Sequence, residues 1–314
     1  MSRSSLQPAP TNAFVSLIIV TYNSAPLLPA FFATLTTTVY APYEIIVVDN
    51  ASDDNTCYYL AAEHSHVRLL ANQHNVGFGS ACNQGAKAAR GDVLVFLNPD
   101  IRVTPDWLSL LVEHITEDPD TTILCPTTLY PDGTPQRTST AVREVAAVPG
   151  CAMMMRTSAW QKLGGFDEHM FLYWEDIELC WRCWLSGGRV LADLQAIVYH
   201  ERGGSAGDQR WDAERTKNSL YTYLKLMRWQ RVIPFATQLM VKTLVKLFIG
   251  RGEGLLGAWR WNMVHLTHTL ASRQQILGQD TCSSDHLERM IDIHNAEQQY
   301  YRQHKKKERI TTHS

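Results

Sequence analysis

Short runs of consecutive apolar residues recur along the first part of the chain. A strand that packs on one face alternates apolar and polar residues, whereas a strand covered on both faces is apolar throughout. We therefore interpret the runs as buried strands of the kind found in a parallel sheet. They lie at residues 16–20, 44–48, 67–70, 93–97 and 122–125.

Segments with helix-compatible spacing separate these predicted strands. A chain in which strands and helices alternate predicts an α/β layered sheet with right-handed crossovers. Residues 92–97 are expected to form a central strand, and Pro105 suits the first turn of the next helix. The predicted helices lie at residues 26–38, 54–64, 79–90 and 105–117.

The pattern changes after residue 120. Residues 126–137 are rich in turn formers, and Asp132-Gly133 is expected at a hairpin tip. A helix is predicted to begin near Glu175, because apolar residues recur at i, i+3, i+4 and i+7, and to end at Gly187-Gly188. Around it, extended chain is expected at residues 148–156 and 189–200, and loops at residues 163–171 and 201–208.

Beyond residue 210 the chain is predicted to be helical and basic. Ten Lys and Arg residues oppose three Asp and Glu residues between positions 210 and 260. Lys242 and Lys246 share a helical face in a segment, residues 239–249, that is otherwise mostly apolar. Two interpretations stay open: a basic amphipathic helix in a membrane interface, or a helix packed on the domain with solvated lysines. The polar tail from residue 285 is expected to be frayed.

Composition narrows the classes of protein to consider. The 314 residues are 45% hydrophobic and 19% charged, as in ordinary globular proteins, and the formal net charge of −2 gives no case for nucleic acid binding. We find neither a signal-peptide pattern nor an apolar run of about 20 residues. Seven scattered cysteines fit a reduced, cytoplasmic protein, and Cys180 and Cys183 are interpreted as packed helix residues rather than zinc ligands.

Polar residues follow three of the predicted strands. In open α/β sheets, ligands bind beyond the carboxyl ends of the strands, so these residues are candidates for a binding site. No GxGxxG pattern follows the first strand, which argues against a dinucleotide-binding fold. The candidates are Thr21-Tyr22-Asn23, Asp49-Asn50 and Asn98-Pro99-Asp100.

Each candidate has an ordinary structural alternative. Residues 49–50 can accept the N3–H of a uracil or thymine ring on which Tyr22 stacks, or they can start a turn or cap the helix after Ser52. Asp100 suits a Mg²⁺ or Mn²⁺ ion that carries a diphosphate, with Asn98 as a neutral ligand. The same two residues also suit a plain β-turn.

A second group of candidates lies later in the chain. Either carboxylate of Glu175-Asp176 can act as a general base beside an apolar or stacking wall formed by Trp174. Acidic residues in a first helical turn also stabilise the helix dipole, which is the structural alternative. His200 ends its predicted strand and is either a metal ligand or an exposed histidine.

Together these pieces resemble the family-2 glycosyltransferases, and most of all their rhamnosyltransferase-like branch, over about residues 14–230. The resemblance implies a GT-A fold: an α/β, Rossmann-like mixed sheet flanked by helices, with a C-terminal helical extension. Residues 1–13 are then a disordered N-terminus, 14–118 the nucleotide-sugar-binding half, 119–210 the acceptor-binding half and 211–314 the basic helical extension. The matching segments are SLIIVTYNS, EIIVVDNASDD, NVGFGSACNQGAKAARGDVLVFLNPD, VPGCAMMMR, GGFDEHMFLYWEDIELCWR and YHERGGS.

The resemblance also implies a role for each candidate residue. Asp176 matches the catalytic base, with Glu175 beside it, and Asp100 and His200 match the site of a divalent ion, Mg²⁺ or Mn²⁺. Trp174 is expected to contact the acceptor. Asn98 stands where many relatives carry Asp, which removes one charge and leaves open how strictly the enzyme depends on metal. The residues expected to hold the nucleotide are Thr21, Tyr22, Asn23, Asp49, Asn50, Ser52 and Asn98.

The function implied by the resemblance is that of an inverting glycosyltransferase. The expected donor is dTDP-L-rhamnose and the expected acceptor a glycan linked to a polyprenyl diphosphate, in the synthesis of a cell-surface polysaccharide. The expected location is the cytoplasm, at the inner face of the membrane through the basic helices. Two alternatives remain: a transferase that uses a UDP-sugar, and a non-catalytic nucleotide-sugar-binding protein.

Overall fold

The computed structural model describes residues 12–133, 143–201, 211–278 and 284–296. Almost all of the predicted disordered N-terminus lies outside these residues. So do the segment after the Asp132-Gly133 turn, most of the loop predicted at residues 201–208, and the end of the polar tail.

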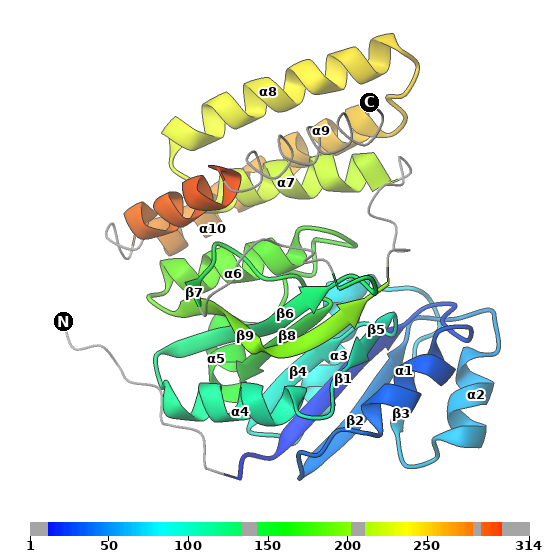
Figure 1. The fold of residues 1–314 in the computed structure, drawn as a ribbon. Coiled ribbons are helices and arrows are strands. Elements are labelled where there is room, and N and C mark those ends of the chain that lie inside the picture. Colours follow the sequence, from blue (N-terminus) through cyan, green and yellow to red (C-terminus); the bar gives the residue numbers. More distant parts are fainter. Residues whose placement is uncertain (1–11, 134–142, 202–210, 279–283, 297–314) are drawn as a thin grey trace, which may run out of the picture.

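Nine strands of the described chain form one mixed sheet (Figure 1). They are β1 (Val15–Thr21), β2 (Tyr43–Asp49), β3 (Arg68–Ala71), β4 (Val93–Leu97), β5 (Ile101–Val103), β6 (Thr121–Leu129), β7 (Arg143–Glu144), β8 (Ala152–Arg156) and β9 (Arg189–His200). The order across the sheet is β3-β2-β1-β4-β8-β6-β9-β5, with β7 paired to β9. Strands β3, β2, β1 and β4 are parallel, whereas β8 runs antiparallel to β4 and β6. The predicted mixed α/β sheet is thereby confirmed.

Helices cover both faces of the sheet and continue beyond it. They are α1 (Leu28–Leu35), α2 (Thr56–Glu63), α3 (Phe78–Ala88), α4 (Trp107–Glu117), α5 (Thr157–Leu163), α6 (Glu175–Leu185), α7 (Asp212–Leu226), α8 (Trp229–Phe248), α9 (Leu255–Val264) and α10 (Leu266–Leu277). Residues 284–296 are also mostly helical. Figure 1 shows α7 lying between α6 and α8, so the C-terminal helices stack on one side of the sheet.

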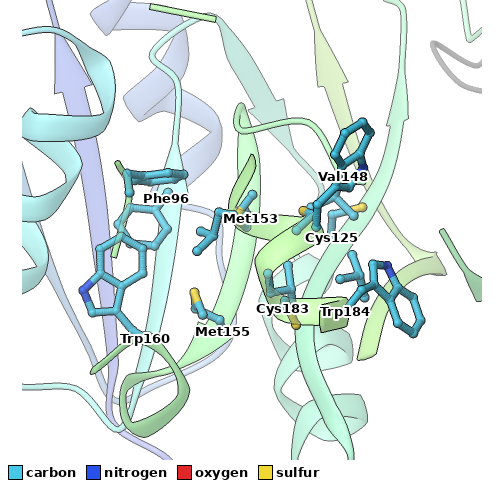
Figure 2. Packing of buried hydrophobic residues seen from close by; sticks show 14 of the residues in the cluster. Phe96, Cys125, Val148, Met153, Met155, Trp160, Cys183 and Trp184 are labelled. Atoms are coloured by element: carbon cyan, nitrogen blue, oxygen red, sulfur yellow. The ribbon is translucent and has the colours of Figure 1, made fainter. Parts of the chain in front are cut away.

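The apolar strands are buried because each of their faces meets a different layer. Leu17 and Ile19 of β1 belong to the cluster that includes α1 and α4, whereas Ile18 and Val20 belong to the cluster that includes α3, α5 and α6. Figure 2 shows part of the second cluster, in which the rings of Phe96 and Trp160 lie 4.7 Å apart. Cover on both faces explains why these runs are mainly apolar. The run at residues 67–70 is the exception to the predicted burial, because β3 lies at the edge of the sheet and its end residues Arg68 and Ala71 are exposed. Cys180 and Cys183, predicted to be packed helix residues, are buried on α6 with free thiols.

Three elements differ from the sequence prediction. Strand β6 continues to Leu129, through a segment predicted to be turn-rich, because Thr127 to Leu129 pair with β9 and Pro126 sits at a register shift. Strand β5 was not expected, since three residues are too few to show a period. The tail predicted to fray from residue 285 is largely helical up to residue 296. Leu287 of this helical segment packs in the core.

A cluster of buried charges fastens α7 to the body of the protein. The Nζ atom of Lys225 lies 2.6 Å from Oδ2 of Asp167 and 2.7 Å from Oε1 of Glu178. Arg182 also pairs with Glu178, at 2.8 Å. Burial alone would raise the pKa of Asp167, but the ammonium group of Lys225 lowers it well below its usual range. Since an unpaired buried charge is costly, these four side chains specify how α7 docks.

Replacing Lys225 with Met is therefore expected to destabilise the fold. The substitution leaves the Asp167 carboxylate buried without its cation, and removing one partner of a buried pair costs about 3–5 kcal/mol. Urea unfolding followed by tryptophan fluorescence measures the loss. The matched control is Lys242→Met, because Lys242 is exposed, and a loss under about 0.5 kcal/mol is expected there. Equal losses in the two variants would show that the buried pairs do not hold α7.

Candidate active site

Several strands bring their ends to one edge of the sheet. Strands β4, β6 and β9 point the same way, and β8, which runs in the opposite direction, starts there. A cavity of about 370 Å³ opens at this edge. Its lining includes five of the side chains singled out from the sequence: Asn98, Asp100, Glu175, Asp176 and His200. The fold thus joins residues from both predicted halves in a single cavity.

Asp100 and His200 meet because β5 and β9 pair in antiparallel fashion, with Ile101 opposite His200. Nε2 of His200 lies 3.1 Å from Oδ2 of Asp100. The second carboxylate oxygen, Oδ1, is buried and has no hydrogen-bond partner among the described residues. Within those same residues, no three His, Cys, Asp or Glu side chains converge on one point. A carboxylate oxygen without a partner beside an imidazole fits a divalent ion that draws its remaining ligands from water and a diphosphate.

Asp176 is held in place in the first turn of α6. Its Oδ2 accepts a hydrogen bond from the backbone N–H of Gly150 at 2.9 Å, and its Oδ1 accepts one from Ile177 at 2.8 Å. Gly150 lies just before β8 and also lines the cavity. Two backbone donors therefore orient this carboxylate, and its other lone pairs remain available for a proton. Sequence reasoning missed Gly150, because its contact with Asp176 is made only in the folded chain.

Glu175 lies beside Asp176 in a different environment. It is 6% exposed, and its Oε2 atom finds no hydrogen-bond partner among the described residues. Burial, together with the negative charge of Asp176, raises the pKa of Glu175 to about 8. The two adjacent carboxyl groups are thus distinguished by their surroundings, and burial favours the protonated form of Glu175.

The predicted nucleotide-binding residues at the ends of β1 and β2 form a hydrogen-bonded cluster. Asp49 is 1% exposed, and Oγ1 of Thr21 donates to its Oδ1 at 2.8 Å. Ser52 donates to the same carboxylate through its backbone N–H at 2.9 Å and its hydroxyl at 2.6 Å. These contacts are those of the turn that the sequence left open as the alternative. Contact of Asp49 with a nucleotide base stays a prediction.

The other residues of this group differ in their exposure. Asn50 is 3% exposed, donates to the carbonyl of Gly77 at 3.1 Å and accepts from Asn72 at 3.0 Å, so it connects β2 to the loop before α3. Tyr22 is 51% exposed, which leaves its ring able to stack on a base. Asn23 adopts a φ of 50° in the turn beside it.

Trp174 does not line the cavity. Its ring packs against those of Trp181, Tyr223 and Phe235, with centroids 6.0, 6.2 and 6.5 Å away. The cavity wall is formed instead by its neighbour Tyr173, which sequence reasoning missed. Both residues have positive φ angles, 70° and 77°, and this left-handed backbone places their rings differently from those of an extended loop. The aromatic run FLYW signalled a wall of this kind but could not say which ring forms it.

Comparison with known proteins identifies the family to which the chain belongs. The model of the family "Glycosyl transferase family 2" matches residues 16–185, more than half of the chain. An N-acetylglucosaminyl-diphospho-decaprenol L-rhamnosyltransferase of Mycobacterium tuberculosis is 26% identical over 236 residues, covering 61% of this chain and 77% of the relative.

Two solved structures share the fold. A mannosyltransferase from Pyrobaculum calidifontis, solved with GDP-Man and Mn²⁺, aligns with a TM-score of 0.55 and 18% identity over 92% of this chain and 88% of its own. S. aureus TarS 1-349 in complex with UDP-GlcNAc aligns with a TM-score of 0.56 and 19% identity, covering 68% of this chain and 67% of that one. The chain is therefore an enzyme of glycosyltransferase family 2, with the GT-A fold.

Proposed function

We propose that this enzyme transfers L-rhamnose from dTDP-L-rhamnose to a lipid-linked glycan, with inversion at the anomeric carbon, in the synthesis of a cell-surface polysaccharide. The observation that carries the reaction type is one cavity shared by the Asp176 carboxylate and the pair Asp100–His200. Support for the sugar and the lipid comes from the 26% identical relative, which is named as a decaprenol-linked L-rhamnosyltransferase.

The donor lies, in this proposal, over the ends of β1, β2 and β4. Residues 14–118 form the nucleotide-sugar-binding half, where Tyr22 stacks on the base near Thr21, Asn23, Asp49, Asn50 and Ser52. Uracil and thymine present the same N3–H, so these residues suit a UDP-sugar equally well. That alternative is favoured by S. aureus TarS, which shares the fold and was solved with UDP-GlcNAc.

The diphosphate is placed at Asp100 and His200, with Asn98 as a neutral neighbour. Mg²⁺ or Mn²⁺ held there would neutralise the charge that develops on the leaving nucleoside diphosphate. Asn98 contributes no charge, so Asp100 supplies the carboxylate of this group of three residues. The mannosyltransferase that shares the fold was solved with Mn²⁺.

The acceptor is placed against residues 119–210, where Asp176 acts as the general base. A hydroxyl group is a weak nucleophile at neutral pH, so Asp176 takes its proton as the oxygen attacks the anomeric carbon. The new C–O bond forms on the face opposite the breaking bond to the diphosphate, which inverts the configuration. One base is sufficient, and no covalent enzyme intermediate is needed. The raised pKa of Glu175 favours its protonated form, which can donate a hydrogen bond to a sugar oxygen in the same cavity.

We also propose that the enzyme works on an anionic membrane surface, at the cytoplasmic face. No helix in the described ranges is long and apolar enough to span a bilayer. Helix α8 instead exposes an apolar face, which we define as Val241, Leu244, Val245 and Phe248; these recur at i, i+3, i+4 and i+7 and are 55%, 57%, 55% and 93% exposed.

The charges beside this face favour lipid over a second copy of the chain. Lys246 pairs with Asp212 at 2.6 Å, which agrees with the packed-helix interpretation for that lysine. Lys242 is exposed and has no carboxylate partner among the described residues. The same holds for Arg251 and Arg260, which lie nearby in sequence. Anionic headgroups would attract these cations, whereas a two-fold copy would bring like charges together.

The proposed reaction predicts that Asp176→Asn lowers kcat by about 10²–10⁴-fold, because the variant cannot take the acceptor proton. Donor affinity is expected to stay within about threefold, since Asp176 is not placed at the nucleotide. The assay offers dTDP-L-rhamnose, UDP-hexoses and UDP-N-acetylhexosamines with Mg²⁺ or Mn²⁺ and a polyprenyl-diphosphate-linked acceptor, and product linkage is read by NMR. Asp106→Asn, an exposed position at the start of α4, is the control.

Other outcomes of this screen discriminate among the alternatives. Turnover of UDP-sugars alone would replace the rhamnose donor with the UDP-sugar alternative. Donor binding without turnover, across both metals and all acceptors, would favour a non-catalytic binding protein. If Asp176→Asn turned over as fast as the parent enzyme, the base would have to be another residue.

The raised pKa of Glu175 predicts a pH-dependent effect of Glu175→Gln. The folded protein keeps the Glu175 proton up to about pH 8, whereas an unfolded chain loses it near 4.5, so stability falls as the pH rises between these values. Gln cannot ionise, so the Tm of Glu175→Gln relative to wild type should rise across this window. Glu44→Gln is the control, because the pKa of Glu44 is lowered and its Tm difference should stay constant there. A constant difference for Glu175→Gln would show that Glu175 is already ionised.

The membrane proposal predicts that the double variant Leu244→Asp/Phe248→Asp loses binding to lipid vesicles. Co-sedimentation with vesicles containing phosphatidylglycerol should fall by at least about tenfold, because two carboxylates would enter the interface. Val39→Asp is the control, since Val39 is 68% exposed on a different part of the molecule. Wild-type protein that stays in the supernatant with anionic vesicles, or an equal loss in the control, would contradict the proposal.

A further inference from the structure

The loop that precedes α6 has an unfavourable backbone conformation. Tyr173 and Trp174 are consecutive non-glycine residues with φ angles of 70° and 77°. Side chains with a Cβ rarely adopt this left-handed conformation, and it persists only where surrounding contacts impose it. The loop leads directly into Glu175 and Asp176, and Leu172 and Tyr173 line the cavity with them. Whatever holds this loop therefore also shapes the site.

One side chain of α7 binds the loop at two points. The carboxamide Nδ2 of Asn218 donates to the carbonyl of Leu172 at 3.0 Å and to that of Tyr173 at 2.8 Å. Asn218 is 1% exposed, so neither hydrogen bond competes with bulk water. Both N–H bonds of one rigid, planar group are thus used on consecutive carbonyls of the strained loop.

The start of α3 also holds the loop. The backbone N–H of Phe78 donates to the carbonyl of Phe171 at 2.9 Å. Gly77, with a φ of 88°, passes so close that a Cβ there would lie 2.4 Å from the same carbonyl oxygen. On the α7 side, the guanidinium of Arg215 lies 4.3 Å from the centre of the Tyr173 ring. The loop is therefore clamped by contacts with both α3 and α7.

We propose that Asn218 is a positioning residue of the active site: by holding the carbonyls of Leu172 and Tyr173, it sets the loop that aims Asp176 into the cavity. This inference rests on the proposed role of Asp176 as the base. It extends the site to α7, which lies beyond residues 16–185 that match the family. A small displacement of a catalytic group can cost about 10²-fold in rate. The loss of two hydrogen bonds to the loop that leads into Asp176 is therefore expected to lower the rate.

A second buried asparagine provides a matched control. The Nδ2 atom of Asn262, on α9, donates to the carbonyls of Lys217 and Ala258 at 3.0 and 3.1 Å, and the residue is 3% exposed. It resembles Asn218 in burial and in its two backbone acceptors, but it is not among the residues that line the cavity, and neither of its acceptors belongs to the loop. A loss of stability common to the two variants therefore reports only the removal of a buried carboxamide.

The test compares Asn218→Ala with Asn262→Ala in the full-length enzyme. For Asn218→Ala we expect kcat to fall by about 10- to 100-fold, with KM for the donor changed by less than about threefold. For Asn262→Ala both constants should stay within about threefold. Equal kcat values in the two variants would overturn the inference. Asn218→Ser, which retains one hydroxyl donor, is measured in the same way if Asn218→Ala does not fold.

A second measurement does not depend on activity. Hydrogen exchange of the amides in residues 171–177 should be faster in Asn218→Ala than in wild type, and unchanged in Asn262→Ala. Unchanged exchange in Asn218→Ala would show that Asn218 does not hold the loop, whatever the rates. If the wild-type enzyme transfers no sugar while exchange responds as expected, the proposed function fails and the clamp stands.

Discussion

The arrangement of the active site depends on one constraint, which is that buried charges must be paired. Asp167, Glu178 and Arg182 lie in the loop before α6 and on α6 itself, and Lys225 of α7 reaches into them. The docking of α7 pairs all four, because the ammonium group of Lys225 is matched to two carboxylates at once. The orientation of α7, and with it the side of the cavity that α7 supports, follows from this pairing.

The consequences extend along α7 at helical spacing. Asn218, Tyr221 and Lys225 are separated by three and four residues, so they share one face. The hydroxyl of Tyr221 donates to Asp167 at 2.8 Å, beside Lys225. When Lys225 pairs with Asp167 and Glu178, Asn218, which lies two turns earlier on α7, reaches the carbonyls of the strained loop. A charge cluster outside the cavity and a hydrogen-bonding group at its wall are thus parts of one rigid connection between α7 and α6.

Much of the architecture was predictable because both faces of the sheet are covered. Apolar runs such as residues 93–97 indicated buried strands, and the polar residues after parallel strands were expected at one edge. Strand β5 and the continuation of β6 could not be predicted, since both are stabilised by pairing with β9 rather than by their own pattern. The helix in residues 284–296 escaped prediction because a few buried residues, Leu287 among them, are enough to dock a largely polar segment.

The sequence by itself determined the chemical groups and their order: Asp100 after a buried strand, Glu175-Asp176 at a helix start and His200 at a strand end. These follow from local patterns that physical chemistry can interpret, together with the resemblance to a family. Only the tertiary structure decided which groups meet. It brought His200 to Asp100, gave Glu175 and Asp176 different surroundings, turned Tyr173 rather than Trp174 to the cavity, and set Asn218 against the loop. Those outcomes depend on burial and on contacts between distant segments, which no local stretch of sequence contains.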